Sequence, residues 1–442
     1  MRKASSRLFH DMNVLSWEIF LELCRGGKTN VLIRNRKLPA KDLILSMVNR
    51  RGLTLHMEVR NYMKIVHPDT QVSKAAYHKQ RMKLNPEAIK FLYQHHNQNY
   101  YQDPEETPRL YSGYLMLAAD GSGINIPTTE ETLELFGTAG RKDAKLQAQL
   151  GLGCLYDVLN RFILDSDINR VKFHEMGVAE EQIARVRDTV GDKYPFMVLM
   201  DRGYPSIPAI MRMIQSNTRF VIRLASTDFK SEQRALISDD EDVEIKLTAS
   251  RRNNYRGTKD EELVNSQDSF MLRMIRVQLD SGEIEVLITN LPREEFSQEM
   301  FKEIYHLRWG IETAYETLKD RLQLENFSGV KARILEQDIY STIYVSNLAE
   351  DIIHDVENEH EERLKTGYKH RMMLNRNVSI GILKDELIHA IIETDQEQKA
   401  VIMQSIYDEL ARNVVPIRPD RHYERNKSNL HAKYSNTHKR SF

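Results

Sequence analysis

Apolar residues recur at intervals of three and four through residues 1–108, which is the spacing of amphipathic helices. The stretch "KDLILSMVNRRGLTLHMEVRNYMKIV" shows it clearly, and the basic stretch "VSKAAYHKQRMKLNPEAIKFLYQ" follows after a short polar connection. Ser73 is a candidate N-cap of the second helix. This succession fits a helix-turn-helix, although an ordinary pair of surface helices gives the same pattern.

Continuous apolar runs replace the helical spacing after the polar segment "YYQDPEETPR". The run in "LYSGYLMLAADGSGINIP" predicts a buried strand that ends at Asp120 and is followed by a turn of small residues. The run in "YPFMVLMDRGY" predicts another strand, with Asp201 at its C-terminal end. Helical patterns lie between these runs, so this part of the chain predicts an α/β core.

Residues 229–292 differ from their surroundings because they are highly charged and then alternate in polarity. The stretch "SFMLRMIRVQLDSGEIEVLITNLP" predicts a β-hairpin that turns at "DSGE". The segment therefore looks like a β-rich insertion. Helical patterns resume after it and continue to about residue 411, and the basic end of the chain, poor in aliphatic residues, predicts an arm that orders on a polyanion.

The segment "YHLRWGIETAYETLK" (residues 305–319) gathers its large polar groups at spacings of three, four and seven. On one continuous helix these groups fall within a sector of roughly 60°. They are Tyr305, Arg308, Glu312 and Lys319. A neighbouring sector is apolar and predicts a packed face, formed by Ile304, Leu307, Ile311, Leu318 and Leu322.

The composition is that of a globular protein, with 442 residues of which 41% are hydrophobic. No apolar run approaches the roughly 18 residues of a membrane span, and the first residues lack a secretory signal, so we expect a cytoplasmic protein. The two cysteines, Cys24 and Cys154, support neither a disulfide framework nor a cysteine zinc site.

The net charge of −1 hides an uneven distribution. Residues 1–110 carry 19 Lys and Arg against 10 Asp and Glu, and residues 412–442 carry 8 against 2, which leaves 36 against 52 in the middle. Basic ends around an acidic centre fit a protein that binds a polyanion at its ends and concentrates carboxylates in its body.

Asp120 and Asp201 at strand ends and Glu312 on a helix can converge at one sheet edge. Carboxylates held so close repel each other unless cations neutralise them, so the cluster implies Mg²⁺ or Mn²⁺ on oxygen ligands. Two such ions can serve phosphodiester cleavage or strand transfer. Singly, each residue has an ordinary alternative: a turn residue for either Asp, and an ion pair on a solvated face for Glu312.

The order of the three acids is that of an RNase H-like nuclease core, and residues 305–319 resemble a more specific signature. Tyr305, Arg308, Glu312 and Lys319 match the Y-(2)-R-(3)-E-(6)-K pattern of IS4-family bacterial insertion-sequence transposases of the DDE type. The blocks "DGSGINIP", "DRGYPS" and "IRPDRHYERNK" also resemble that family, and the resemblance covers about residues 110–425.

The resemblance implies an α/β fold with an RNase H-like catalytic core that is interrupted by a β-rich subdomain. It also implies a helical N-terminal DNA-binding domain and a helical C-terminal region with a basic tail. The expected segments are 1–108 (DNA-binding domain), 109–228 (core, first part), 229–292 (inserted subdomain), 293–335 (core helix with the catalytic Glu) and 336–442 (C-terminal helices and tail).

By the same resemblance Asp120, Asp201 and Glu312 would bind two Mg²⁺ ions, which Mn²⁺ can replace. Arg308 and Lys319 would grip phosphates, and Tyr305 would contact a phosphate or a displaced nucleotide. Trp309 would stack on a base or pack in the core. Further candidate DNA contacts are Arg219 and Arg223 in the α/β core, and Lys74, Lys79 and Arg81 on the basic helix.

The implied activity is cleavage at the ends of an insertion sequence and transfer of those ends into target DNA, by a homodimer at the bacterial nucleoid. A nuclease without strand transfer would need the same carboxylates and metals. A DNA-binding protein derived from a transposase would keep the basic elements without catalysis. The intact set of three acids argues against a DNA-binding protein without catalysis. It does not distinguish a transposase from a nuclease without strand transfer.

Overall fold

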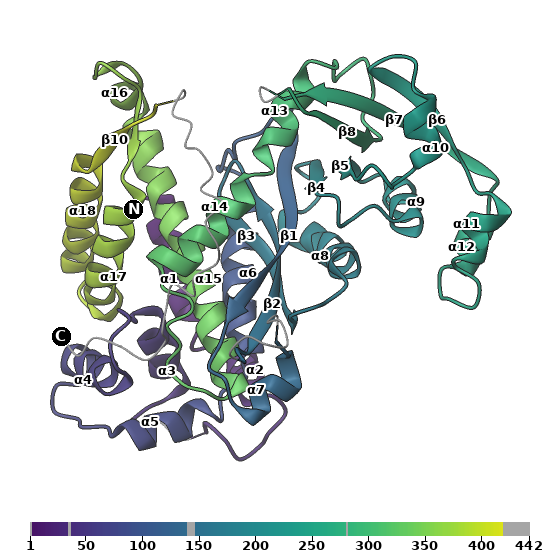
Figure 1. Ribbon diagram of the computed structural model, residues 1–442. Helices are drawn as coiled ribbons and strands as arrows, with labels where there is room; N and C mark the ends of the chain where they lie inside the picture. Colours follow the sequence, from purple (N-terminus) through teal and green to yellow (C-terminus); the bar gives the residue numbers. More distant parts are fainter. Residues whose placement is uncertain (1, 34–36, 139–145, 280–281, 419–442) are drawn as a thin grey trace. The chain divides into compact units, whose positions relative to one another are not determined.

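The computed structural model describes residues 2–33, 37–138, 146–279 and 282–418. They form two compact units, each built from separate parts of the chain (Figure 1). The sheet unit comprises residues 101–123 and 151–315, and the helical unit comprises residues 1–100, 124–150 and 316–442. Among the described residues, no helix has both the length and the apolar composition that a membrane span requires.

A mixed eight-stranded sheet organises the sheet unit, in the order β3-β2-β1-β4-β5-β8-β7-β6. Strand β4 pairs in parallel with β1 and β5, while β8 pairs antiparallel with β5 and β7. This confirms an α/β fold. The strands are β1 Leu115–Asn125, β2 Gln149–Asp157, β3 Phe162–Arg170, β4 Phe196–Met200, β5 Arg219–Leu224, β6 Asp240–Lys246, β7 Ser269–Gln278 and β8 Ile284–Thr289.

The predicted hairpin is confirmed as β7 and β8, and with β6 these strands extend the sheet beyond β5 (Figure 1). A buried apolar cluster joins this extension to the rest of the sheet, with Leu199 of β4, Val221 of β5 and Ile275 of β7 at its centre. Burial of one such side chain contributes about 2 kcal/mol. Residues 229–292 thus share a core with β4 and β5.

Helices flank the sheet, and α13 packs onto the same apolar cluster through Phe301 and Ile304. Helices α8 to α12 lie between successive strands, and α14 follows α13 after the last strand of the sheet. The helices are α8 Glu175–Val190, α9 Ile207–Gln215, α10 Lys230–Ala235, α11 Ala249–Asn253, α12 Glu261–Asn265, α13 Met300–Leu307 and α14 Gly310–Glu316.

The helical unit surrounds the 28-residue helix α15, Ala332–Glu359, much of which is buried. Helices α1, α3, α17 and α18 all pack on it. Ser73 caps α5 by accepting a hydrogen bond from the Ala76 amide, as predicted. The remaining elements are α1 Lys3–Val14, α2 Glu18–Arg25, α3 Ala40–Val48, α4 Leu55–Val66, α5 Lys74–Arg81, α6 Glu87–Tyr101, α7 Glu130–Phe136, the π-helix η1 Thr317–Arg321, α16 Glu361–Thr366, α17 Arg376–Ile392, α18 Gln396–Arg412, and a two-stranded pair of β9 Met372–Leu374 and β10 Val414–Pro416.

The turn predicted after Asp120 is wrong, because β1 runs without interruption through "DGSGIN". The glycines serve close packing instead of a turn. A Cβ on Gly121 would lie 2.8 Å from the Phe173 ring, and one on Gly151 would lie 2.5 Å from it. Phe173 therefore needs glycine on the strands beneath it, and Asp120 lies in the middle of a strand.

The single helix predicted for residues 305–319 is also wrong, because the chain makes a turn at Arg308 and Trp309 between α13 and α14. The amides of these two residues bond to carbonyls three residues earlier, at Tyr305 and His306. After α14 the helix widens into η1, and π-helical turns are rare and often found at functional sites. The predicted apolar face is buried nonetheless, with Ile304, Ile311 and Leu318 at most 1% exposed.

Candidate active site

The register of β1 and β4 brings Asp120 and Asp201 to neighbouring positions. Ala118 pairs with Leu199 in the parallel ladder, and two further residues along each strand lead to Asp120 and Asp201. Paired positions of a sheet present their side chains on the same face, with strands about 4.8 Å apart. Asp201, directly after the end of β4, thus lies near Asp120 in the sheet unit, and the two carboxylates form part of a candidate site.

Glu312 lies in the first turn of α14 and pairs with Arg308, whose Nη2 is 3.0 Å from the Glu312 Oε1. Arg308 is only 3% exposed. Its guanidinium lies 5.7 Å from the ring centroids of both Tyr305 and Trp309. Burial opposes the charge of Arg308, but Tyr305, Asp201 and Glu312 outweigh it and raise the pKa of the guanidinium. A fixed positive charge therefore stands beside the Glu312 carboxylate.

Tyr305 donates a hydrogen bond from its hydroxyl to the Asp201 Oδ1, over 3.2 Å. Arg223 of β5 approaches the same oxygen at 3.8 Å and pairs more closely with Glu285, at 2.7 Å. Burial raises the pKa of the Tyr305 phenol, so it remains a donor at neutral pH. Three residues predicted from the sequence, Tyr305, Arg308 and Arg223, thus lie around the acids as direct or near neighbours.

Glu175, the first residue of α8, is a further carboxylate of this site that the sequence did not reveal. A Cβ added to Gly121 would lie 3.1 Å from the Glu175 Oε1, and a Cβ added to Gly203 would lie 3.2 Å from the Glu175 Oε2. Those glycines follow Asp120 and Asp201 closely in the chain. An acid in the first turn of a helix is ordinary because it complements the helix dipole, so the sequence carried no signal for its role.

The surroundings of Asp120 disfavour its charged form. Burial raises the pKa of Asp120 to about 6. The Gly121 amide and Arg308 oppose this shift, and the charges of Glu175 and Glu312 add to it with smaller effects. Burial and the charge of Asp201 likewise raise the pKa of Glu175. No ion pair to Asp120 forms within the described part of the chain.

Carboxylate oxygens are the donors that hard divalent cations prefer, and uncompensated charge favours their binding, so the chemistry of the site fits such an ion. The geometry is not that of a preformed centre, because the described ranges contain no group of three His, Cys, Asp or Glu side chains arranged to hold a metal.

The transposase DDE domain family matches residues 111–348 of the chain, which is more than half of its length. The chain belongs to this family. The matched region contains Asp120, Asp201 and Glu312. Members of the family generally use divalent metal ions, which agrees with the excess of carboxylates in the site.

Curated relatives of this DDE-domain protein match over a short segment. Over 68 residues it is 34% identical to the putative transposase InsL for insertion sequence element IS186A of Escherichia coli K12, and equally to the transposase for insertion sequence element IS421 of Escherichia coli. The match covers 15% of this chain and 18% of each relative. The chain thus spans less than a fifth of the length of these relatives.

One solved structure with a similar arrangement is the cryo-EM structure of the piggyBac transposase synaptic complex with hairpin DNA. The similarity has a TM-score of 0.47 at 10% sequence identity, over 90% of this chain and 84% of that one. This level of similarity is too low to establish a shared fold.

The other residues predicted to contact DNA differ in their exposure and in their bonding partners. Lys319 lies half-buried on η1, in the helical unit. Arg219 donates to the Asn290 carbonyl over 3.0 Å, and Trp309 is 39% exposed. Lys74 and Lys79 are exposed on α5. All five stay predicted DNA contacts, and the "IRPDRHYERNK" block lies mostly outside the described residues.

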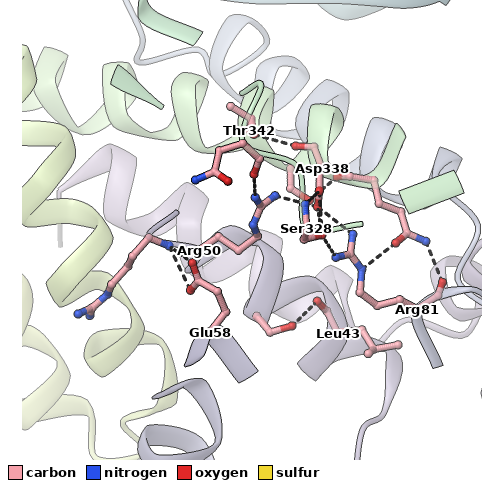
Figure 2. A network of polar contacts seen from close by, with 12 residues as sticks. Leu43, Arg50, Glu58, Arg81, Ser328, Asp338 and Thr342 are labelled. Carbon is pink, nitrogen blue, oxygen red and sulfur yellow. Dashed lines mark hydrogen bonds and ion pairs between the residues drawn. The ribbon is translucent and has the colours of Figure 1, made fainter. Parts of the chain in front are cut away.

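Arg81 is the exception, because the structure contradicts its predicted contact with DNA. It is 1% exposed, and Figure 2 shows it together with Arg50 converging on Asp338. The Arg81 Nη2 and the Arg50 Nη1 lie 2.9 and 2.8 Å from the same Asp338 oxygen. Arg81 lies four residues after the buried Tyr77, on the inward face of α5. Its charge is therefore paired inside the helical unit.

Proposed function

We propose that this protein is a DDE transposase that cleaves DNA at the ends of an insertion sequence and transfers those ends into target DNA. The observation that carries the proposal is the placement of Asp120, Asp201 and Glu312 in one unit of a DDE-family domain, where burial and neighbouring carboxylates raise the pKa of Asp120. The match with insertion-sequence transposases supports the same substrate.

Asp120, Asp201 and Glu312 would hold the divalent ions, two Mg²⁺ or Mn²⁺ by the resemblance to IS4-family enzymes. Such ions activate an attacking oxygen and stabilise a leaving one in phosphodiester chemistry. The protein's own part is orientation: Tyr305 fixes one oxygen of Asp201, and Arg308 fixes one oxygen of Glu312. Arg308 is 3% exposed and bonded to Glu312, so its predicted grip on a DNA phosphate would require its side chain to move outward.

We also infer how the domains are arranged along the chain. An RNase H-like core is supported by the order β3-β2-β1-β4-β5 with β1, β4 and β5 parallel. Residues 229–292 would be the insertion between Asp201 and Glu312, and residues 1–108 the DNA-binding part. The segments 109–228 and 293–335 would make up the core, and 336–442 the C-terminal region. A homodimer would act on paired ends, in the cytoplasm at the nucleoid.

The test is cleavage of a labelled element end with Mg²⁺ by the isosteric variants Asp120→Asn, Asp201→Asn and Glu312→Gln. Each removes one carboxylate charge, so we expect cleavage to fall on the order of a thousandfold or more. Asp268→Asn is the matched control, since Asp268 is fully exposed in the same unit, and it should cleave as the wild type does. Cleavage by all three site variants at the wild-type rate would refute the proposal. A joined product with target DNA distinguishes a transposase from a nuclease that stops after cleavage.

A further inference from the structure

Tyr315 connects the helix that carries Glu312 to the strand that carries Asp120. It lies on α14 and is 6% exposed. Its hydroxyl is 2.8 Å from the carbonyl oxygen of Asp120 and 2.9 Å from that of Leu152 in β2. The single hydroxyl proton is thus shared between a carbonyl of β1 and a carbonyl of β2. The β1 carbonyl is that of Asp120, whose side chain is part of the candidate site.

The opposite end of α14 is fixed by a close contact. Gly310 begins the helix, and a Cβ at this position would lie 3.1 Å from the Val158 Cβ and 3.2 Å from its Cγ1. The absence of a side chain at residue 310 favours this close approach of the helix to Val158, the residue that follows β2. Glu312 lies between these two attachments, two residues after Gly310 and three before Tyr315.

The spacing of three residues puts Glu312 and Tyr315 on one face of α14. A shift of the helix along its axis or about it would therefore move both side chains together. Packing alone does not account for the hydroxyl, because a Phe ring would fill the same space. A hydroxyl in such a buried place requires partners, and its partners here are the two strand carbonyls.

We propose that Tyr315 is a positioning residue that sets the separation between Glu312 and Asp120, and so tunes the affinity of the site for divalent cations. This inference rests on the proposed function of those acids. Tyr315 touches neither cation nor DNA in this account, because it acts through the backbone of Asp120 and the orientation of α14.

The test compares Tyr315→Phe with Tyr101→Phe, each as the full-length protein. Tyr101 is the control: it is fully buried in the same unit, and its hydroxyl donates over 2.8 Å to Asp157, which is not among the carboxylates proposed to bind the cation. Mn²⁺ binding is followed by the rise in melting temperature with Mn²⁺ concentration, and cleavage is followed as a function of Mg²⁺ concentration. Loss of a hydrogen bond of ordinary net strength should raise the half-saturating concentration of either ion roughly fivefold in Tyr315→Phe. It should leave that concentration unchanged in Tyr101→Phe.

Gly310→Ala provides a second variant that displaces the other end of α14, and it should shift the same concentration in the same direction. Wild-type half-saturation in both Tyr315→Phe and Gly310→Ala would overturn the inference. An equal shift in Tyr101→Phe would also overturn it, because the effect would then be a general consequence of a lost buried hydroxyl. If Asp120→Asn cleaved as fast as the wild type, the proposed function itself would fail. That result is distinct from the outcomes that test Tyr315.

Discussion

Asp351 in the helical unit is a buried carboxylate and Asp120 in the sheet unit is a half-buried one, and their surroundings shift the two pKa values in opposite directions. Asp351 accepts two hydrogen bonds from Arg7, with its Oδ2 2.8 Å from the Arg7 Nε, and lies 3.4 Å from the His96 Nε2. Although burial alone would raise it, these cations lower the pKa of Asp351 to about 2. Burial with too little compensation raises that of Asp120 to about 6.

We propose that the difference separates a structural charge, that of Asp351, from a functional one, that of Asp120. In the helical unit the protein supplies its own cations, as Arg50 and Arg81 also do for Asp338, and these ion pairs join segments that are distant in sequence. In the sheet unit Arg308 and Arg223 are shared among several acids. The charge that is missing there is the one that a bound cation would bring.

The largest expected effect on stability is in the helical unit. Asp351→Asn leaves Arg7 and His96 buried without their shared anion, and breaking a buried pair in this way costs about 3–5 kcal/mol. The measurement is urea unfolding at pH 7. Lys365→Ala is the control, because Lys365 and Glu361 form an exposed pair on α16 that is worth less than about 0.5 kcal/mol. A loss below 1 kcal/mol for Asp351→Asn would mean that its ion pairs are not structural.

The two acids should also respond to pH in opposite ways. Asp351 has a lowered pKa, so its contribution to stability is present above its ordinary pKa near 3.8 and is lost as pH falls toward about 2. Asp120 has a raised pKa, so its ionisation destabilises the fold increasingly from about pH 4 to pH 6. Without divalent ions, Asp120→Asn should therefore be more stable than the wild type above pH 6, by about 1–2 kcal/mol, and equal to it below pH 4.

Unfolding free energies of the wild type and both variants, measured from pH 3 to pH 8, check this prediction. A wild type that remains more stable than Asp120→Asn above pH 6 would show that the Asp120 charge is compensated by the protein after all.

The smallest effect concerns the basic helix α5, where exposed and buried cations stand side by side. Removing Lys74 and Lys79 together should lower the salt dependence of DNA binding by about two units of log–log slope, if each contacts one phosphate. Lys365→Ala should leave the slope unchanged. Arg81→Ala should instead lower the unfolding free energy, because Arg81 binds Asp338. Fluorescence anisotropy of an element-end duplex from 50 to 200 mM salt provides the slopes.

Features with a local cause were predictable from the sequence. The β7–β8 hairpin follows from alternation around a turn, and the cap at Ser73 from the residue type before a helical pattern. The acids Asp120, Asp201 and Glu312 could be named because each stands beside an apolar run or within a recognisable signature.

Features with a distant cause were not predictable. The glycine after Asp120 is required by Phe173, the break before α14 is accompanied by contact between Gly310 and Val158, and Arg81 finds its partner 257 residues away in the chain. Periodicity reports on neighbours along the chain and carries no information on such contacts. The same reason hid Glu175, whose helix brings it to the acids only in the folded unit.

Metal-dependent stabilisation tests most directly whether the carboxylates around Asp120 bind a divalent cation, as we propose. Mn²⁺ at a hundredfold excess over its dissociation constant should stabilise the wild type by about 2.7 kcal/mol, measured as a saturable rise in the melting temperature. Asp120→Asn and Glu312→Gln should lose most of that rise, while Asp268→Asn should keep it. An equal rise in all four proteins would contradict the account, because the cation would then bind elsewhere.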